Sequence, residues 1–478
     1  MRVILKRKEL NNLLSALLFL LLTVGMYFFA PNYYSKTFCS VLLLVYVFIS
    51  YKIISLTTYN NNYITFHTLF LISFLFVNFI YPIFIYPLDP FYFSVFRRTF
   101  DVSVISKSTA LSLVAVSSYY VGVVLIRERD EKPEMISKDV LLEIKKILTY
   151  IYIFCISLFL YFMGSRVLNG DFGVTSMIPP GLLVITQVCI NLIVLISFNI
   201  YNLSNNFSSF LYSFPKDVLL LSILFVLIFL YTGDRGPAIQ LVLIFLVAFS
   251  LYVKNINAKT LLAIALFGML NLSFVQGART KDVIAVGGGG VTNFVSRGIN
   301  NFEINNFWDI GMDLIVSNYP LYAGYDYVNE EGYLYGSNMF TYLFAPFPLV
   351  PSLMSSLLFD SSPSELTTAN LITKRANSTY GLGTNMVIDI YMAFGFVGVV
   401  IFMFFLGFVI TFVQVNAFIN KFKFVIVHGL LISFSIYLPR ASMFDPLRHV
   451  IWALFLFLLI FLVIRNSKKG SNEIFDAN

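Results

Sequence analysis

Charged side chains are scarce in this sequence. Asp, Glu, Lys and Arg make up 12% of its 478 residues, whereas apolar residues make up 58%. A soluble protein of this length needs far more polar surface to face water. The composition therefore excludes a soluble protein and predicts an all-α polytopic membrane protein. The net charge of +7 is spread over short loops, which gives no reason to expect a nucleic-acid partner.

Cysteine and several ligand-binding motifs are also rare or missing. The three cysteines, Cys39, Cys155 and Cys189, lie in apolar runs at spacings that fit neither disulfides nor zinc. The glycine run in 286–294 lacks the context of a nucleotide-binding loop, and the first outer loop has no D-x-D motif. We therefore expect no cofactor and no metal. No small-residue cleavage site follows the first apolar run, so we expect it to stay as a membrane span.

Long apolar runs are abundant instead. A helix needs about 20 mainly apolar residues to cross the hydrocarbon layer. Twelve runs approach this length, at 12–30, 37–56, 64–86, 104–126, 147–164, 179–200, 217–232, 237–253, 259–276, 386–413, 424–439 and 448–464. They predict a bundle of about twelve transmembrane helices with both termini on one side.

Basic residues set the orientation and differ in kind between the two sides. With cytoplasmic termini, 19 basic residues lie inside and 13 outside, although the outer segments are far longer. Lysine outnumbers arginine 14 to 5 inside, whereas arginine outnumbers lysine 9 to 4 outside. Because the guanidinium fork binds phosphate and carboxylate bidentately, this bias favours an anionic ligand on the outer face. Contact with lipid headgroups is the alternative.

The predicted organisation has four parts. Spans one to nine occupy 1–276, a long outer (periplasmic) loop occupies 277–385, spans ten to twelve occupy 386–465, and a cytoplasmic tail occupies 466–478. In the loop, 300–319 resembles one amphipathic helix, with Asp309 and Asp313 on a shared face. The tyrosines of 319–338 suit sugar stacking or an aromatic belt. Three prolines in 339–358 favour a surface-lying or re-entrant segment over a thirteenth span.

The stretch YTGDRGPAIQ (231–240) places Asp234 and Arg235 between two apolar runs. An arginine at the centre of a bilayer costs about 2.5–3.5 kcal/mol, so we expect a turn that lifts it to the surface. Glycines at 233 and 236 permit the turn, and Pro237 suits the first turn of the next helix. Four arginines at outer span ends are predicted to surround one cavity: Arg235, Arg279, Arg440 and Arg448.

These residues also carry a resemblance to a known family. TGDRGPAIQL (232–241), GARTKD (277–282), GLGTNMVIDIYMAFGFVGVV (381–400) and YLPRASMFDPLRHVIW (437–452) resemble the Wzy family of O-antigen and oligosaccharide-repeat-unit polymerases. The resemblance covers about 217–465. It implies a metal-independent, type C-like glycosyltransferase of the bacterial inner membrane. Such an enzyme transfers a growing glycan from undecaprenyl diphosphate to the non-reducing end of a new lipid-linked unit, for O-antigen, capsule or exopolysaccharide, with a chain-length regulator as a further partner.

That reaction releases a diphosphate, whose developing charge fixed arginines would stabilise. We assign Arg235, Arg279, Arg440 and Arg448 to this task, with Lys281, Arg297 and Arg375 as further candidates for substrate binding. The alternative for Arg235 and Arg448 is an ion pair with Asp234 or Asp445 at a helix end. A base must also take the acceptor's proton, and the candidates, left open here, are His449, Glu303, Asp309 and Asp313.

Three other functions compete with a polymerase. An O-antigen ligase would have the same architecture and donor but another acceptor. A lipid-linked oligosaccharide flippase is disfavoured because we find no internal repeat and one loop dominates. A scaffold would leave the outer arginines without a purpose.

Overall fold

The computed structural model describes residues 7–98, 100–126, 136–163, 179–201, 210, 212–231, 234–277, 306–419 and 421–475. Within these ranges every regular element is a helix, which confirms the predicted all-α class. A helix satisfies its own backbone hydrogen bonds, which is what an apolar chain needs where the lipid interior supplies no water.

Each of the twelve apolar runs falls on a helix. The helices are α1 (Arg7–Phe28), α2 (Lys36–Thr57), α3 (Phe66–Leu75) continued by the π-helix η1 (Phe76–Ile85), α4 (Val104–Val124), α5 (Lys138–Met163), α7 (Pro180–Ile200), α9 (Lys216–Tyr231), α10 (Arg235–Tyr252), α11 (Ala258–Gly277), α19 (Met386–Phe418), α20 (Phe422–Phe434) and α21 (Leu447–Phe475). By length and composition, eight helices of the described ranges can cross a membrane: α1, α2, α3 with η1, α5, α7, α10, α19 and α21. A count of twelve crossings stays a prediction.

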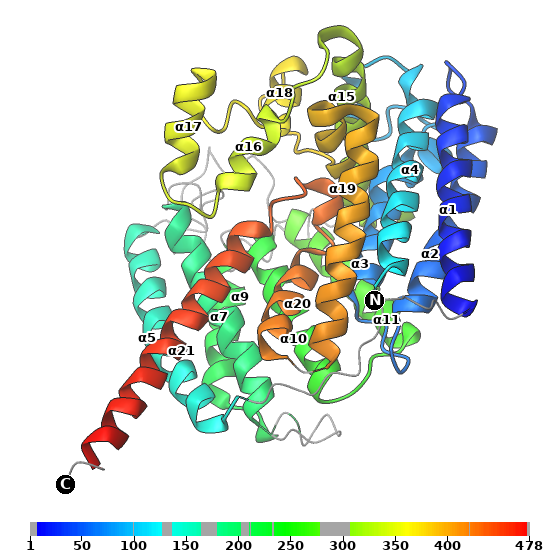
Figure 1. Ribbon diagram of the computed structural model, residues 1–478. Coiled ribbons are helices and arrows are strands. Elements are labelled where there is room, and N and C mark those ends of the chain that lie inside the picture. Colours follow the sequence, from blue (N-terminus) through cyan, green and yellow to red (C-terminus); the bar gives the residue numbers. More distant parts are fainter. Residues whose placement is uncertain are drawn as a thin grey trace.

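Short helices gather at one end of the bundle, which we call the outer end. They are η2 (Ser94–Arg97), α13 (Phe307–Ile310), α14 (Met312–Ile315), α15 (Asn318–Glu331), α16 (Ser337–Phe344), α17 (Val350–Phe359), α18 (Thr368–Arg375) and η5 (Leu438–Arg440). Figure 1 shows α15 to α18 at the top, whereas α1 begins at its lower end and α21 ends at the bottom. The start of α1 and the end of α21 therefore point away from these short helices.

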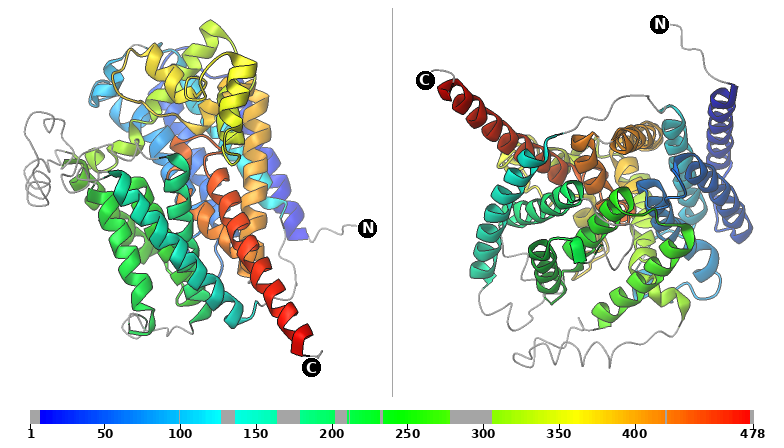
Figure 2. Two further views of the ribbon diagram at one scale, coloured as in Figure 1. Left: turned by 90° about the vertical axis from the view of Figure 1, so that its left-hand side faces the viewer. Right: turned by 90° about the horizontal axis from the view of Figure 1, so that it is seen from below.

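Two clusters of buried side chains divide the bundle. The first joins α1 to α4, α15 and most of α19, and the second joins α5, α7, α9 and α21. Seen from below, the blue helices and the teal to green helices occupy different halves (Figure 2). Helices α10 and α20 contribute to both clusters, through Leu243 and Ile432 to the first and through Leu241 and Leu430 to the second. We call α10 and α20 the seam helices.

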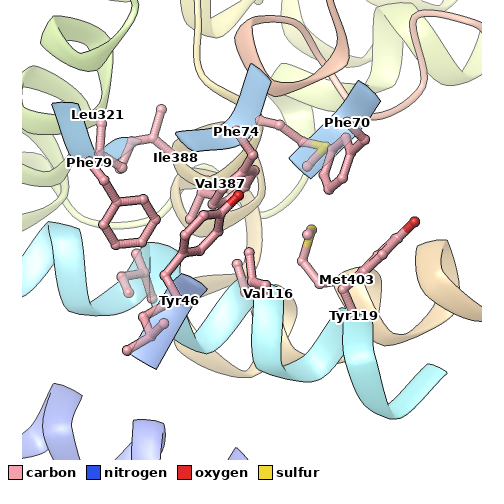
Figure 3. Close-up of a cluster of buried hydrophobic side chains, with 14 of the residues drawn as sticks. Tyr46, Phe70, Phe74, Phe79, Val116, Tyr119, Leu321, Val387, Ile388 and Met403 are labelled. Carbon is pink, nitrogen blue, oxygen red and sulfur yellow. The ribbon is translucent and has the colours of Figure 1, made fainter. Parts of the chain in front are cut away.

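The first cluster is centred on aromatic rings between α2, α3, α4 and α19 (Figure 3). Here α4 and α19 approach until their backbones touch. A Cβ on Gly122 would overlap the carbonyl oxygen of Phe404, and a Cβ on Gly407 would overlap that of Tyr119. Small residues allow this approach, which gives van der Waals contact where lipid provides no hydrophobic drive between helices.

Helix α19 changes direction at Gly395, whose φ of 67° and ψ of −161° are not helical. Only glycine adopts this backbone conformation without strain. The break frees the carbonyl of Met392, which accepts a hydrogen bond of 2.7 Å from the N–H of Leu334. The outer turns of α19 are thereby joined to the segment that connects α15 and α16.

The predicted amphipathic helix over 300–319 is wrong in the part that the structure describes. The chain forms two single turns, α13 and α14, separated at Gly311. A Cβ at Gly311 would lie 2.9 Å from the ring of Phe76, so the close approach to η1 sets the break. As a result, Asp309 and Asp313 do not share a face.

Three tyrosines of α15 differ from both predicted uses. Tyr319, Tyr322 and Tyr325 are buried in the first cluster, so they face neither a sugar nor lipid headgroups. Segment 339–358 forms a bent pair of helices, α16 and α17, joined through Leu349 with a left-handed φ of 68°. The indole N–H of Trp452 donates to the carbonyl of Pro346 at 2.7 Å and ties this bend to α21.

We expect Gly122→Ala to destabilise the protein by about 1–3 kcal/mol, the usual cost of overpacking, because the new methyl group meets backbone that cannot rotate away. The midpoint of thermal unfolding in detergent measures the effect. Gly25→Ala is the matched control, since a Cβ there meets nothing within 4 Å. Equal midpoints for the two variants would show that α4 and α19 are not in backbone contact.

Candidate active site

Arg235 stands at the first position of α10, at the outer end of a seam helix. Asp234 before it has an extended backbone, and Pro237 occupies the first turn, where a missing N–H costs no intrahelical bond. The side chain of Arg235 is only 12% exposed. A charge so enclosed needs a partner of opposite sign.

Asp313 is that partner and links two arginines. Nη2 of Arg235 forms an ion pair with Oδ2 of Asp313. Nη1 of Arg440 donates a hydrogen bond of 2.7 Å to the backbone carbonyl of the same residue. The structure thus brings Arg235, Arg440 and Asp313 together, and Arg235 pairs with Asp313 and not with its neighbour Asp234.

Arg440 is carried by η5, the short helix that follows the second seam helix, α20. Its guanidinium lies 5.9 Å from the ring centre of Tyr437. Burial raises the pKa of Tyr437, while the charges of Arg440 and Arg235 lower it and those of Asp313 and Asp234 raise it. These five groups therefore share one electrostatic environment. Both arginines occupy the outer ends of seam helices, where the two halves of the bundle meet.

Two buried polar atoms near these outer helix ends lack a hydrogen-bond partner among the described residues. They are Nη1 of Arg235 and Nδ1 of His449. The ring of His449 packs against Phe434 of α20 at 4.9 Å between centres. Buried polar groups are nearly always satisfied, and exceptions concentrate at functional sites. Nη1 of Arg235 can therefore donate a hydrogen bond to a group other than Asp313.

Arg448 lies in the first turn of α21, eight positions after Arg440 along the chain. Within the described residues it makes no ion pair within 4.0 Å, so the alternative of a capping pair with Asp445 is not realised. Asp445 still feels its charge: burial raises the pKa of Asp445, and Arg448 lowers it in part. The segment from 437 to 449 therefore supplies Tyr437, Arg440, Asp445, Arg448 and His449 to the outer end.

Comparison with protein-family models gives a match over residues 12–469 to the family described as O-antigen polysaccharide polymerase Wzy. The match spans nearly the whole chain. The chain belongs to the Wzy family. No curated protein and no solved structure matches it.

Membership in the Wzy family makes the chain a multi-pass bacterial membrane protein and a polymerising enzyme of the glycosyltransferase type. Its substrates are lipid-linked oligosaccharides, and its pathway is polysaccharide biosynthesis.

Sequence analysis missed Asp389, a fully buried carboxylate in the first turn of α19. Its Oδ1 accepts hydrogen bonds from Thr368 at 2.5 Å and Asn338 at 3.0 Å, and its Oδ2 accepts one from Ser442 at 2.7 Å. The start of a helix also favours a negative charge. Asp389 thereby joins α16, α18, α19 and the segment of Arg440. In the sequence, Asp389 is a single acidic residue in an apolar run, and nothing in that run predicts its hydrogen-bond partners.

Two other predicted site residues lie in different surroundings. Arg375 of α18 pairs with Asp326 at 3.3 Å and with Glu330 at 2.6 Å, both on α15. Burial lowers its pKa, but the hydrogen bond and charge of Glu330, together with the charge of Asp326, raise it by more. Asp309 accepts a hydrogen bond of 2.7 Å from Tyr92 and one of 2.9 Å from the N–H of Asn306, which caps α13.

The other candidates lie outside the described residues: Arg279, Lys281, Arg297 and Glu303. Among the residues that the structure describes, no group of three or more His, Cys, Asp or Glu side chains is placed to hold a metal ion.

Asp389→Ala should loosen the outer end, because three donors lose an acceptor, and hydrogen bonds to a charged group contribute about 1.5–3 kcal/mol each. Limited proteolysis of the protein in proteoliposomes is expected to cut faster in the segment around α16 and α18. Thr368→Val removes one of the three bonds and should give a smaller effect. Cleavage as slow as in the unsubstituted protein would show that Asp389 does not hold these helices.

Proposed function

We propose that this Wzy-family protein polymerises undecaprenyl-diphosphate-linked oligosaccharide repeat units at the outer face of the bacterial inner membrane. It transfers the growing glycan from its lipid carrier to the non-reducing end of a single lipid-linked unit. The type C-like architecture, twelve crossings, cytoplasmic termini and a chain-length-regulating partner belong to the same proposal. The lysine-rich segments at the end that holds both termini support this orientation.

One observation carries the proposal: Arg235 and Arg440 converge on Asp313 at the outer ends of the seam helices. Planar guanidinium groups present paired N–H donors that match phosphate oxygens. Asp313 keeps the two groups close together despite their like charge. A diphosphate that enters this place meets preoriented donors, including the free Nη1 of Arg235.

The chemistry then follows from charge. A hydroxyl of the acceptor sugar attacks the anomeric carbon of the donor glycan, and the bond from that carbon to the diphosphate breaks. The leaving diphosphate gains negative charge, which the fixed guanidinium groups stabilise without reorganisation. In this proposal arginine supplies the positive charge, without a metal ion. Five further basic residues are proposed to bind the same carrier or glycan: Arg448, Arg375, Arg279, Lys281 and Arg297.

A ligase would use the same arginines on the same donor, so the acceptor alone separates it from a polymerase. A deletion strain decides between them. We expect its glycan gel to lose the ladder and keep single repeat units on the acceptor lipid. Loss of all attached sugar would instead identify a ligase or a flippase and would refute the proposal.

Arg235→Ala and Arg440→Ala should each lower polymerisation about 10²–10³-fold, the usual loss when one transition-state donor is removed. Surface glycan is then limited to single repeat units, while the protein level in the membrane stays unchanged. Arg235→Lys should rescue poorly, because an ammonium group cannot bind bidentately.

Arg97→Ala is the matched control for these variants. Arg97 is an exposed outer arginine on η2 that makes no ion pair with the described residues. Its variant should keep the normal ladder. Normal ladders from both Arg235→Ala and Arg440→Ala would remove the two residues from the mechanism.

A further inference from the structure

Asp445 lies between η5 and α21, on the segment that carries Arg440 and Arg448. The inference about it rests on the proposed polymerase function, which requires a group to take the proton from the acceptor's hydroxyl. Sequence analysis left that base open and treated Asp445 only as a partner of Arg448.

The carboxylate of Asp445 is partly buried and has no hydrogen bond or ion pair within the described part of the chain. Three other carboxylates of the outer end are engaged. Asp313 neutralises Arg235, Asp309 accepts hydrogen bonds from Tyr92 and Asn306, and Asp389 accepts bonds from three side chains. A base needs a free lone pair, and among the described residues Asp445 meets this condition.

The position of Asp445 is fixed by its own backbone and by Asp389. The N–H of Asp445 donates to the carbonyl of Ser442 at 3.0 Å, which closes a turn. The hydroxyl of Ser442 in turn donates to Oδ2 of Asp389 at 2.7 Å. The turn is therefore anchored to the first helical turn of α19. The backbone that carries the Asp445 carboxylate is therefore fixed in position.

The charged and titratable groups around Asp445 are few. Arg448 and His449 follow it on α21, and Tyr342 of α16 lies within electrostatic range of both Asp445 and Asp389. Burial raises the pKa of Asp445, and the charge of Arg448 lowers it in part. A raised pKa makes the ionised carboxylate a stronger base.

We propose that the carboxylate of Asp445 is the general base that deprotonates the acceptor sugar. The O–H bond of the acceptor breaks and its proton passes to an oxygen of Asp445. The hydroxyl's electron pair forms the new bond to the anomeric carbon of the donor. The electrons of the old carbon–oxygen bond leave with the diphosphate, which Arg235 and Arg440 hold. Asp445 then gives its proton to water.

The test uses the full-length protein in nanodiscs with a synthetic lipid-linked repeat unit. Asp445→Asn should lower kcat about 10²–10⁴-fold, the range that general-base catalysis contributes. Inhibition by undecaprenyl diphosphate, which reports on the arginines, should stay unchanged. Glu331→Gln, a change at an exposed carboxylate at the end of α15, is the control and should keep full activity.

The pH profile gives a second readout. A base works only when ionised, so the unsubstituted protein should lose activity as the pH falls through the raised pKa of Asp445, above the usual aspartate value of about 3.9. The residual activity of Asp445→Asn should not decline in this way. The activity of Asp445→Glu should still decline, but at a different pH. If Asp445→Asn does not fold, Asp445→Glu alone decides. If its activity falls at the same acidic pH as that of the unsubstituted protein, the assignment of the base is wrong.

The remaining outcomes separate a failure of the proposed function from a failure of the proposed base. If the unsubstituted protein does not elongate the unit, the proposed function fails. If it elongates and Asp445→Asn does so at more than half its rate, only the base is wrong. Loss of the acid limb in Asp234→Asn but not in Asp445→Asn would transfer the role to Asp234 and refute the inference.

Discussion

Neutralisation of Arg235 by Asp313 is the interaction on which the outer end depends. An apolar bundle cannot enclose a guanidinium group without an anion, because desolvation of an unpaired charge costs several kcal/mol. Asp313 belongs to α14, which packs on η1 in one half, whereas Arg235 begins α10 at the boundary with the other half. The backbone carbonyl of Asp313 also receives Arg440. One residue thereby closes the boundary between the halves and collects positive charge there.

Asp389 complements this arrangement with neutral donors. Its carboxylate is held by Thr368, Asn338 and Ser442 and forms no ion pair with any residue that the structure describes. The two acidic residues therefore do different work. Asp313 balances charge at the ligand-facing end, and Asp389 fixes the short helices and the arginine-bearing segment to α19. Separation of these tasks leaves Asp445 free of structural duties.

Sequence patterns predicted the helices well, because a long apolar run has few alternatives in a membrane. They also predicted that Arg235 and Arg440 lie together, since charges between apolar runs must reach an end of the bundle. The break at Gly311 escaped prediction because it depends on the ring of Phe76, which lies far away in the sequence. Asp389 escaped for the same reason. Hydropathy describes one segment at a time, whereas the hydrogen-bond partners of Asp389 come from three other segments.

The backbone contacts of Gly122 with Phe404 and of Gly407 with Tyr119 also limit how the enzyme can move. Helices whose backbones touch cannot slide or tilt without steric clash, so α4 and α19 must travel as one rigid body. Any opening within the bundle would then fall at the border between the two halves, along the seam helices α10 and α20.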